Sequence, residues 1–184
     1  SDYSDIVFMP PGTYFNDDPN ADFTLMMWAN VASVNPQTLV GYVSLISFGN
    51  FDHASQVEVN MRYDGYLMVL VTHHLDYTVD SWVVLTNNTM IKKNEWFHVA
   101  IVFKGAPLHH MSIYYNGLAV GDGAAVAPGK RMRLSNFFGR NSDWMVDEKP
   151  IVADFDEIKL IARALNPAEI RSHYENNGPY MSDI

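Results

Sequence analysis

Hydrophobic and polar residues alternate in short segments along most of this chain, and Gly, Pro, Asn or Asp interrupts the segments about every ten residues. Alternation that is rich in β-branched and aromatic residues is typical of strands with one buried face. The pattern predicts strands near residues 22–31, 40–49, 56–63, 65–73, 81–87, 96–103, 110–116, 118–123, 133–140 and 155–165. Asp64-Gly65 and Asn116-Gly117 lie between consecutive predicted strands, where such dipeptides favour hairpin turns. We therefore expect an all-β fold, a sandwich of two antiparallel sheets.

One short helix is predicted near the C-terminus, over about 167–175, because capping residues frame it. Asn166 suits the N-cap position, and Pro167 suits the first helical position, where a missing N–H costs nothing. Glu169 is placed to reach back to the N-cap backbone. The segment 176–179, Asn-Asn-Gly-Pro, then ends the helix. We expect about three turns that lie across the sandwich.

The strand predicted at 96–103 is apolar on both faces, which is typical of a central strand covered by a second layer. Trp96, His98, Ala100 and Val102 share one of these faces. His98 has two interpretations. It is either a packed histidine whose ring bonds a backbone carbonyl or an imidazole that faces a ligand.

Composition narrows the classes of protein to consider. The 184 residues fit one domain, and the 48% hydrophobic content is enough for a sizeable core. The net charge of -9 argues against binding to nucleic acid, whose phosphates need a basic surface. The absence of cysteine excludes disulfides, thiolate metal ligands and a thiol nucleophile. No apolar run is long enough to span a membrane, so we expect no membrane insertion.

Four stretches, in this order, resemble the laminin G-like family of concanavalin A-like, pentraxin-like jelly rolls. They are DFTLMMWANV (22–31), NEWFHVAIVFKG (94–105), MSIYYNGLAV (111–120) and FFGRNSDW with ADFDEIKLIARALNPAEIRSHY (137–174). The resemblance implies a two-sheet antiparallel jelly roll with one short C-terminal helix. It also implies a single domain over 1–184 with its core at about 22–175. This fold hosts lectins, adhesion modules and polysaccharide-cleaving enzymes, so it does not by itself imply one function.

The resemblance also implies a site in two loops, FGNFDHASQ (48–56) and FGRNSDW (138–144), which correspond to calcium loops at one rim in pentraxin-like members. Calcium takes six to eight oxygen ligands, which carboxylates and amides can supply. The predicted metal ligands are Asn50, Asp52, Asn141, Asp143 and Asp147. The predicted ligand-binding residues are Asn50, Asp52, His53, Asn141, Asp143 and Trp144, with His53 and Trp144 as flanking contacts for a sugar. The alternative is that these Asn and Asp residues only stabilise turns by bonding their own backbone.

Other charged groups have two interpretations each. The acidic segment FNDDPNADF (15–23) is a cation site or a solvated turn. Asp156 shares strand parity with Ile158 and Leu160, so we expect it to face the core as a structural acceptor. The sharper alternative pairs Asp154 with Asp156 as glycosidase carboxyls, but the Glu-x-Asp-x-x-Glu strand of jelly-roll glucanases is absent. Lys130, Arg131 and Arg133 form a basic patch for acidic polysaccharides or a solvated loop.

These observations favour a noncatalytic carbohydrate-binding or adhesion module of a secreted, cell-surface or particle-surface protein, assisted by calcium at the two loops. Its partner would be a glycan or polysaccharide. One alternative is a structural assembly domain that binds protein partners. A second alternative is a polysaccharide-active enzyme, a glycoside hydrolase or polysaccharide lyase, which the missing catalytic motifs disfavour.

Overall fold

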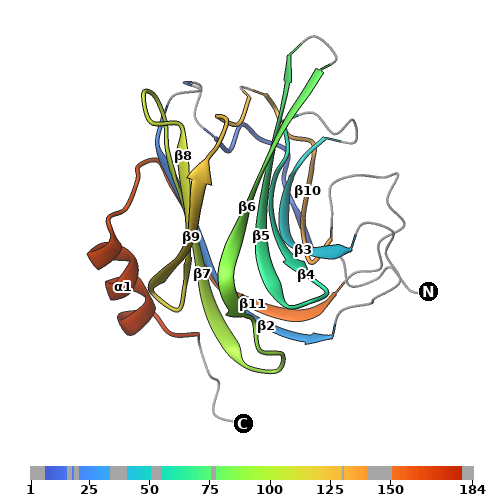
Figure 1. The fold of residues 1–184 in the computed structure, drawn as a ribbon. Coiled ribbons are helices and arrows are strands. Elements are labelled where there is room, and N and C mark those ends of the chain that lie inside the picture. The colour runs from blue at the N-terminus through green and yellow to red at the C-terminus, as the bar shows by residue number, and fades with distance from the viewer. Residues whose placement is uncertain are drawn as a thin grey trace, which may run out of the picture.

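The computed structural model describes residues 7–15, 18, 21–33, 41–50, 55–75, 78–129, 131–140 and 151–179, with the backbone alone for 73–75 and 78–89. It contains two antiparallel sheets, of strand order β1-β10-β3-β4-β5-β6 and β11-β2-β7-β8-β9 (Figure 1). The strands of the first sheet are β1 (Val7–Met9), β3 (Tyr42–Gly49), β4 (Val57–Arg62), β5 (Tyr66–Leu75), β6 (Thr78–Met90) and β10 (Ser135–Phe138). Those of the second are β2 (Phe23–Ser33), β7 (Trp96–Lys104), β8 (His110–Tyr115), β9 (Leu118–Ala124) and β11 (Val152–Ile161). The predicted two-sheet antiparallel sandwich is confirmed.

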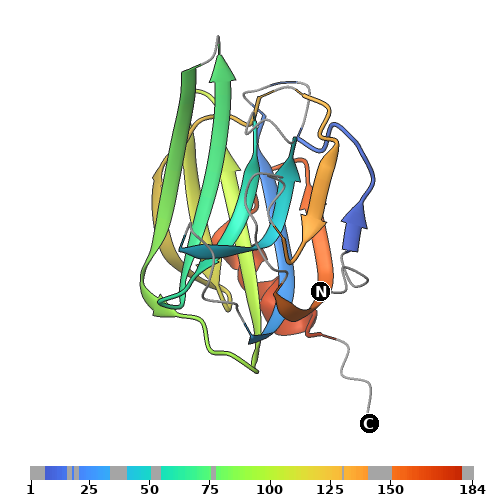
Figure 2. The ribbon, with the colours of Figure 1, turned by 90° about the vertical axis from the view of Figure 1, so that its right-hand side faces the viewer.

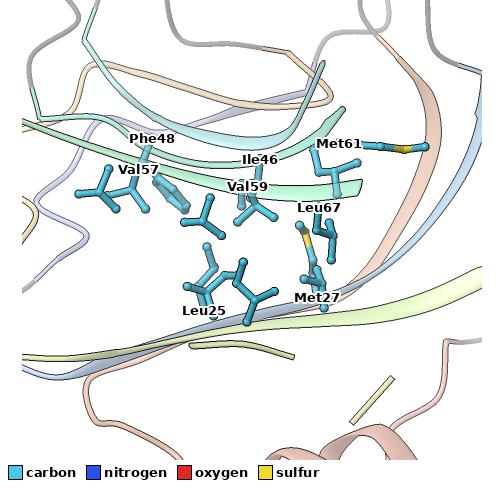
Figure 3. Packing of buried hydrophobic residues seen from close by; sticks show 14 of the residues in the cluster. Leu25, Met27, Ile46, Phe48, Val57, Val59, Met61 and Leu67 are labelled. Atoms are coloured by element: carbon cyan, nitrogen blue, oxygen red, sulfur yellow. The ribbon is translucent and has the colours of Figure 1, made fainter. Parts of the chain in front are cut away.

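The main core lies between the two sheets, where alternate residues of each strand meet. Leu25 and Met27 of β2 face the apolar side chains of β3, β4 and β5 (Figure 3). These labelled partners are Ile46, Phe48, Val57, Val59, Met61 and Leu67. Each is no more than 3% exposed, which accounts for the hydrophobic positions of the alternating sequence pattern.

The helix α1 (Pro167–Asn176) covers part of the outer face of the five-stranded sheet (Figure 1). Asn166 Oδ1 accepts from the N–H of Glu169 at 3.0 Å, and Glu169 Oε2 accepts from the N–H of Asn166 at 2.8 Å. This reciprocal capping confirms the predicted helix start. A second apolar cluster forms beneath the helix from Met26, Ala100, Val102, Tyr114, Leu165 and Ile170. It explains why the strand at 96–103 is apolar on both faces.

His98 is packed beneath this helix and is 2% exposed. Its ring lies 5.5 Å from the Trp28 ring and 6.2 Å from the Tyr174 ring, measured between centroids. Its buried Nδ1 has no hydrogen-bond partner among the described residues, so that nitrogen bonds none of their backbone carbonyls, contrary to the packed interpretation. Burial lowers the pKa of His98 to about 4, and the positive charges of His173 and Lys159 lower it further in the same direction.

Two differences from the predicted strands have local causes. Sequence analysis missed β1, which has three residues and is followed by Pro10-Pro11, because so short a segment contains almost no alternation. In Figure 2, β1 and β10 lie at one edge of the six-stranded sheet. The last strand ends at Ile161 instead of 165, because 162–166 leave the sheet to lead into α1. Within the part of the chain that the structure describes, no helix is long and apolar enough to cross a membrane.

Candidate functional site

Of the predicted loop site, only Asn50 lies within the described residues. It is 6% exposed, and both groups of its amide are used inside the protein. Asn50 Oδ1 accepts from the N–H of Leu134 at 2.9 Å, and Nδ2 donates to the carbonyl of Met132 at 3.2 Å. These bonds tie the end of β3 to residues 132–134. The other predicted calcium and ligand residues lie outside the described residues and stay predictions, namely Asp52, His53, Asn141, Asp143, Trp144 and Asp147.

The two predicted loops leave the six-stranded sheet at opposite ends of β10. Antiparallel pairing places Ser135 beside Gly49 and Phe138 beside Ile46. The first loop therefore begins near the start of β10. The second begins after its end, where the N–H of Gly139 donates to Leu45 at 2.9 Å. Four residues of strand separate Leu45 from Gly49, about 13 Å at about 3.3 Å per residue. The described ends of the two loops therefore lie at opposite ends of β10, because neighbouring antiparallel strands run in opposite directions. The shared rim stays a prediction for the loop residues that lie outside the described ranges.

Arg133 of the expected basic patch is a structural residue and is 0% exposed. Its guanidinium donates to the carbonyls of Ser55 (3.1 Å), Arg131 (3.2 Å) and Gly129 (3.1 Å). It also lies 4.7 Å from the centre of the Phe15 ring. Burial and, secondarily, the charge of Arg131 lower the pKa of Arg133 to about 10. A guanidinium enclosed in this way cannot contact a polysaccharide.

The proposed carboxylate pair, Asp154 and Asp156, lies on β11 at the edge of the five-stranded sheet. Asp156 pairs with Trp28 in the register, so it faces outward, contrary to the expected core orientation. The reason is a bulge between Asp156 and Lys159, which reverses the parity of the strand; Glu157 adopts a φ of 49° there. Asp154 is exposed and Asp156 is half-buried. Neither of them lines either of the two depressions described below, so they form no catalytic pair across a cleft there.

Sequence analysis missed a buried carboxylate, Glu58, at the centre of the six-stranded sheet. It is 0% exposed and lies on the face opposite the core. Ser47 Oγ donates to its Oε1 at 3.1 Å, and Asn60 Nδ2 donates to its Oε2 at 3.2 Å. The signal was an acidic residue inside the alternating segment VEVN. Because Glu58 is enclosed, it satisfies neighbouring polar groups and presents no open site.

An open depression lies on the outer face of the five-stranded sheet, between β7–β8 and the segment that leads into α1. We call it the sheet-face groove. It has a volume of about 350 Å³, and its lining includes Asp22, Val102, Lys104, Ser112, Tyr114, Leu165 and Pro167. Pairing of Val102 with Ser112 and of Ala100 with Tyr114 brings the side chains of β7 and β8 onto one face. The opposite wall is anchored because Thr24 Oγ1 accepts from the N–H of Leu165 at 3.0 Å.

The groove carries polar groups of both signs. Asp22 Oδ1 accepts from the N–H of Gly105 at 2.8 Å, which orients the carboxylate. Lys104 is exposed, Ser112 is half-buried and Tyr114 is 7% exposed. Among the described residues, the side-chain polar groups of these three have no hydrogen-bond partner. Burial raises the pKa of Tyr114 above its ordinary value of 10.0, so the proton that this hydroxyl carries at neutral pH is retained to higher pH. The groove thus offers donors and acceptors beside an apolar floor.

A smaller cavity of about 110 Å³ adjoins the groove and shares Asp22 with it. Asp18 lines this cavity as well, whereas Asp17 and Asn20 of the same acidic segment lie outside the described residues. Where residues are described, no group of three or more His, Cys, Asp or Glu side chains is placed to hold a metal ion. The cation interpretation of this segment therefore stays a prediction.

Comparison with known proteins identifies the family. Residues 4–171 match the concanavalin A-like lectin/glucanases superfamily. This chain belongs to that superfamily. The predicted family resemblance is thereby confirmed. A search of curated proteins found no match.

Solved structures of this superfamily's fold are similar at low identity. The binding domain of Paraclostridial Mosquitocidal Protein 1 matches with a TM-score of 0.62 and 19% identity, over 94% of this chain and 40% of that one. A SAP-like pentraxin from Limulus polyphemus matches at 0.59 and 16%, over 93% and 75%. A Trypanosoma rangeli sialidase matches at 0.57 and 16%, over 84% and 23%. The chain spans less than half of the toxin domain, and identities this low show the fold alone.

Proposed function

We propose that this chain is a noncatalytic recognition module of an extracellular, cell-surface or particle-surface protein, and that it binds carbohydrate in the sheet-face groove. The observation that carries the proposal is the combination of an apolar floor with unpartnered donors and acceptors in one open depression. Sugars present hydroxyls and apolar C–H faces together, so they match such a lining. Binding sites generally place a few polar groups among apolar ones in this way.

A binding role fits the groove better than catalysis does. Hydrolysis of a glycoside ordinarily needs two carboxyl groups on opposite sides of the bond. Asp22 is the one carboxylate that lines the described groove. The nearby Glu169 is engaged by Arg163 at 2.8 and 3.0 Å and by the N–H of Asn166. The similar toxin binding domain and pentraxin support a recognition role in an extracellular setting.

The alternative, assembly with protein partners, is favoured by a different feature. The edge strand β1 exposes Val7 (56%) and Phe8 (67%) beside an unpaired strand edge. Neighbouring Met132 and Leu134 are also exposed, at 57% and 58%. Unpaired edges with apolar side chains are the usual sites of strand addition.

A glycan array probed with the purified protein, with calcium and with chelator, tests the proposal. We expect retention of a subset of glycans, loss of this retention in Ser112→Ala, and no release of reducing ends from soluble polysaccharides. Lys92→Ala, at an exposed position of the segment before β7, is the matched control and should bind as the parent does. No retained glycan, together with concentration-dependent self-association, would instead favour the assembly alternative.

A further inference from the structure

Two charged groups line the sheet-face groove, and two bonded pairs of ionisable side chains lie beside it. His110 Nε2 lies 3.0 Å from Asp122 Oδ2 on β8 and β9, beside the groove. On the other side, Arg163 and Glu169 form a bidentate pair. The groups left to act on a ligand are the ammonium of Lys104 and the second carboxylate oxygen of Asp22. The lining of the groove therefore carries one negative and one positive charge.

The start of α1 adds no anion site to this groove, although helix N-termini often bind anions. Pro167 has no N–H to donate. The N–H of Glu169 is bonded to Asn166 Oδ1, and the N–H of Asn166 is bonded to the Glu169 carboxylate. The capping box thus uses the N–H groups of Asn166 and Glu169, two of the donors that a sulfate or carboxylate would need at this helix start. An acidic ligand would also lie beside Asp22 in a chain of net charge -9.

The hydroxyl groups in the groove suit a ligand that both donates and accepts. Tyr114 is 7% exposed and its hydroxyl lacks a partner among the described residues, so this hydroxyl can both donate and accept. The hydroxyl of Ser112 lies on the same face of β8, two residues before Tyr114. A carboxylate accepts from sugar hydroxyls and an ammonium donates to them, so neighbouring hydroxyls of one sugar can use all four groups.

We infer that the sheet-face groove selects an uncharged sugar unit over acidic ones. Asp22 is the charged acceptor, Lys104 is the charged donor, and the Ser112 and Tyr114 hydroxyls complete the set. This inference rests on the proposed function and names the class of carbohydrate. The volume of about 350 Å³ is at the lower end for small-molecule sites, so the groove takes a terminal or branch unit, not a long stretch of polymer.

The test is calorimetric titration of the parent protein with matched oligosaccharides that end in a neutral hexose, a uronic acid or a sulfated hexose. We expect the neutral sugar to bind at least about tenfold more tightly than the two acidic ones. Ser112→Ala and Lys104→Met should each weaken neutral-sugar binding by about tenfold, the usual effect of losing a hydrogen bond to a ligand. Asp22→Asn keeps the side-chain oxygen that accepts from the N–H of Gly105 but removes the negative charge. It should therefore bind acidic sugars more tightly than the parent does, which reduces the preference for neutral sugars. Lys92→Ala should change nothing, and unchanged thermal melting shows that each variant is folded.

The outcomes separate the inference from the proposed function. Tighter binding of a uronic or sulfated sugar, weakened by Lys104→Met, would overturn the inference and leave the recognition role intact. Neutral-sugar binding that Ser112→Ala and Lys104→Met leave unchanged would also overturn it, because the site would then lie elsewhere. Absence of binding to every sugar, and to a glycan array, would overturn the proposed function and the inference together.

Discussion

Acidification should destabilise the protein through His98. This side chain is 2% exposed beneath α1, and its ring contacts the rings of Trp28 and Tyr174. Burial, followed by the positive charges of His173 and Lys159, lowers its pKa from 6.5 to about 4 in the folded state. In the unfolded chain the imidazole is hydrated and keeps its ordinary pKa of about 6.5. The two states therefore bind a proton in different ranges of pH.

The sign follows from which state takes up the proton first. As the pH falls below about 6.5 the unfolded chain is protonated, whereas folded His98 stays neutral until about pH 4. The contribution of neutral His98 to the free energy of unfolding is thus fully present above about pH 6.5, and it is lost progressively as the pH falls to about 4. The linkage relation gives a loss of about 2 kcal/mol at pH 5 and about 3 kcal/mol at pH 4, relative to neutral pH.

Urea unfolding at pH 7.5 and pH 5, for the parent and for His98→Gln, measures this loss. The decrease in unfolding free energy between the two pH values should be about 2 kcal/mol smaller in His98→Gln, because glutamine does not titrate. His110→Gln, at a surface position of β8, controls for the removal of a histidine as such. If His98→Gln keeps the full pH dependence of the parent, the assignment of this effect to the buried imidazole is refuted.

Three further changes test other parts of the structure. Arg133→Met should lower the unfolding free energy by about 3 kcal/mol or more, because the carbonyls of Ser55, Gly129 and Arg131 lose their donor, whereas exposed Arg131→Met should cost less than about 0.5 kcal/mol by urea unfolding. Asn166→Ala should cost about 1 kcal/mol, since it removes the cap of α1; an unchanged melting temperature would contradict that role. If the predicted calcium loops bind the ion, calcium should stabilise the parent by about 2.7 kcal/mol at a hundredfold excess over its dissociation constant. The double variant Asp52→Ala with Asp143→Ala should lose this gain in melting curves, and no calcium shift in the parent would remove calcium from these loops.

The features that could be predicted from the sequence depend on near neighbours along the chain. The capping of α1 involves Asn166 and Glu169, three residues apart, so its chemistry is visible in the letters alone. Alternation likewise identifies the core face of a strand such as β4, because side chains point to opposite faces in turn. The family resemblance added the two-sheet arrangement, which no single strand could indicate.

The features that sequence analysis placed wrongly depend on backbone irregularity or on distant partners. One extra residue at Glu157 reverses the parity of β11, so counting back from Leu160 assigned Asp156 to the wrong face. Arg133 looked like part of a surface cluster, since its acceptor at Ser55 is distant in the sequence and becomes close only after folding. Charge alone cannot distinguish an exposed arginine from one whose donors are all satisfied inside.

The position of the groove follows from how far α1 extends over the sheet. One row of paired residues crosses the outer face from β2 to β9, and it passes from Thr24 and Val102 to Ser112 and Asp122. Thr24 and Val102 are covered by the segment that leads into α1 and are no more than 3% exposed. Ser112 and Asp122, in contrast, are accessible to solvent. The change from buried to solvent-accessible residues therefore occurs where the cover ends, and the groove lies along that boundary. Its apolar floor and its unpartnered hydroxyls both result from a helix and a preceding segment that cover only part of a sheet face. The groove could not be recognised in any one stretch of the sequence, because it is built from segments near residues 22, 104, 112 and 165.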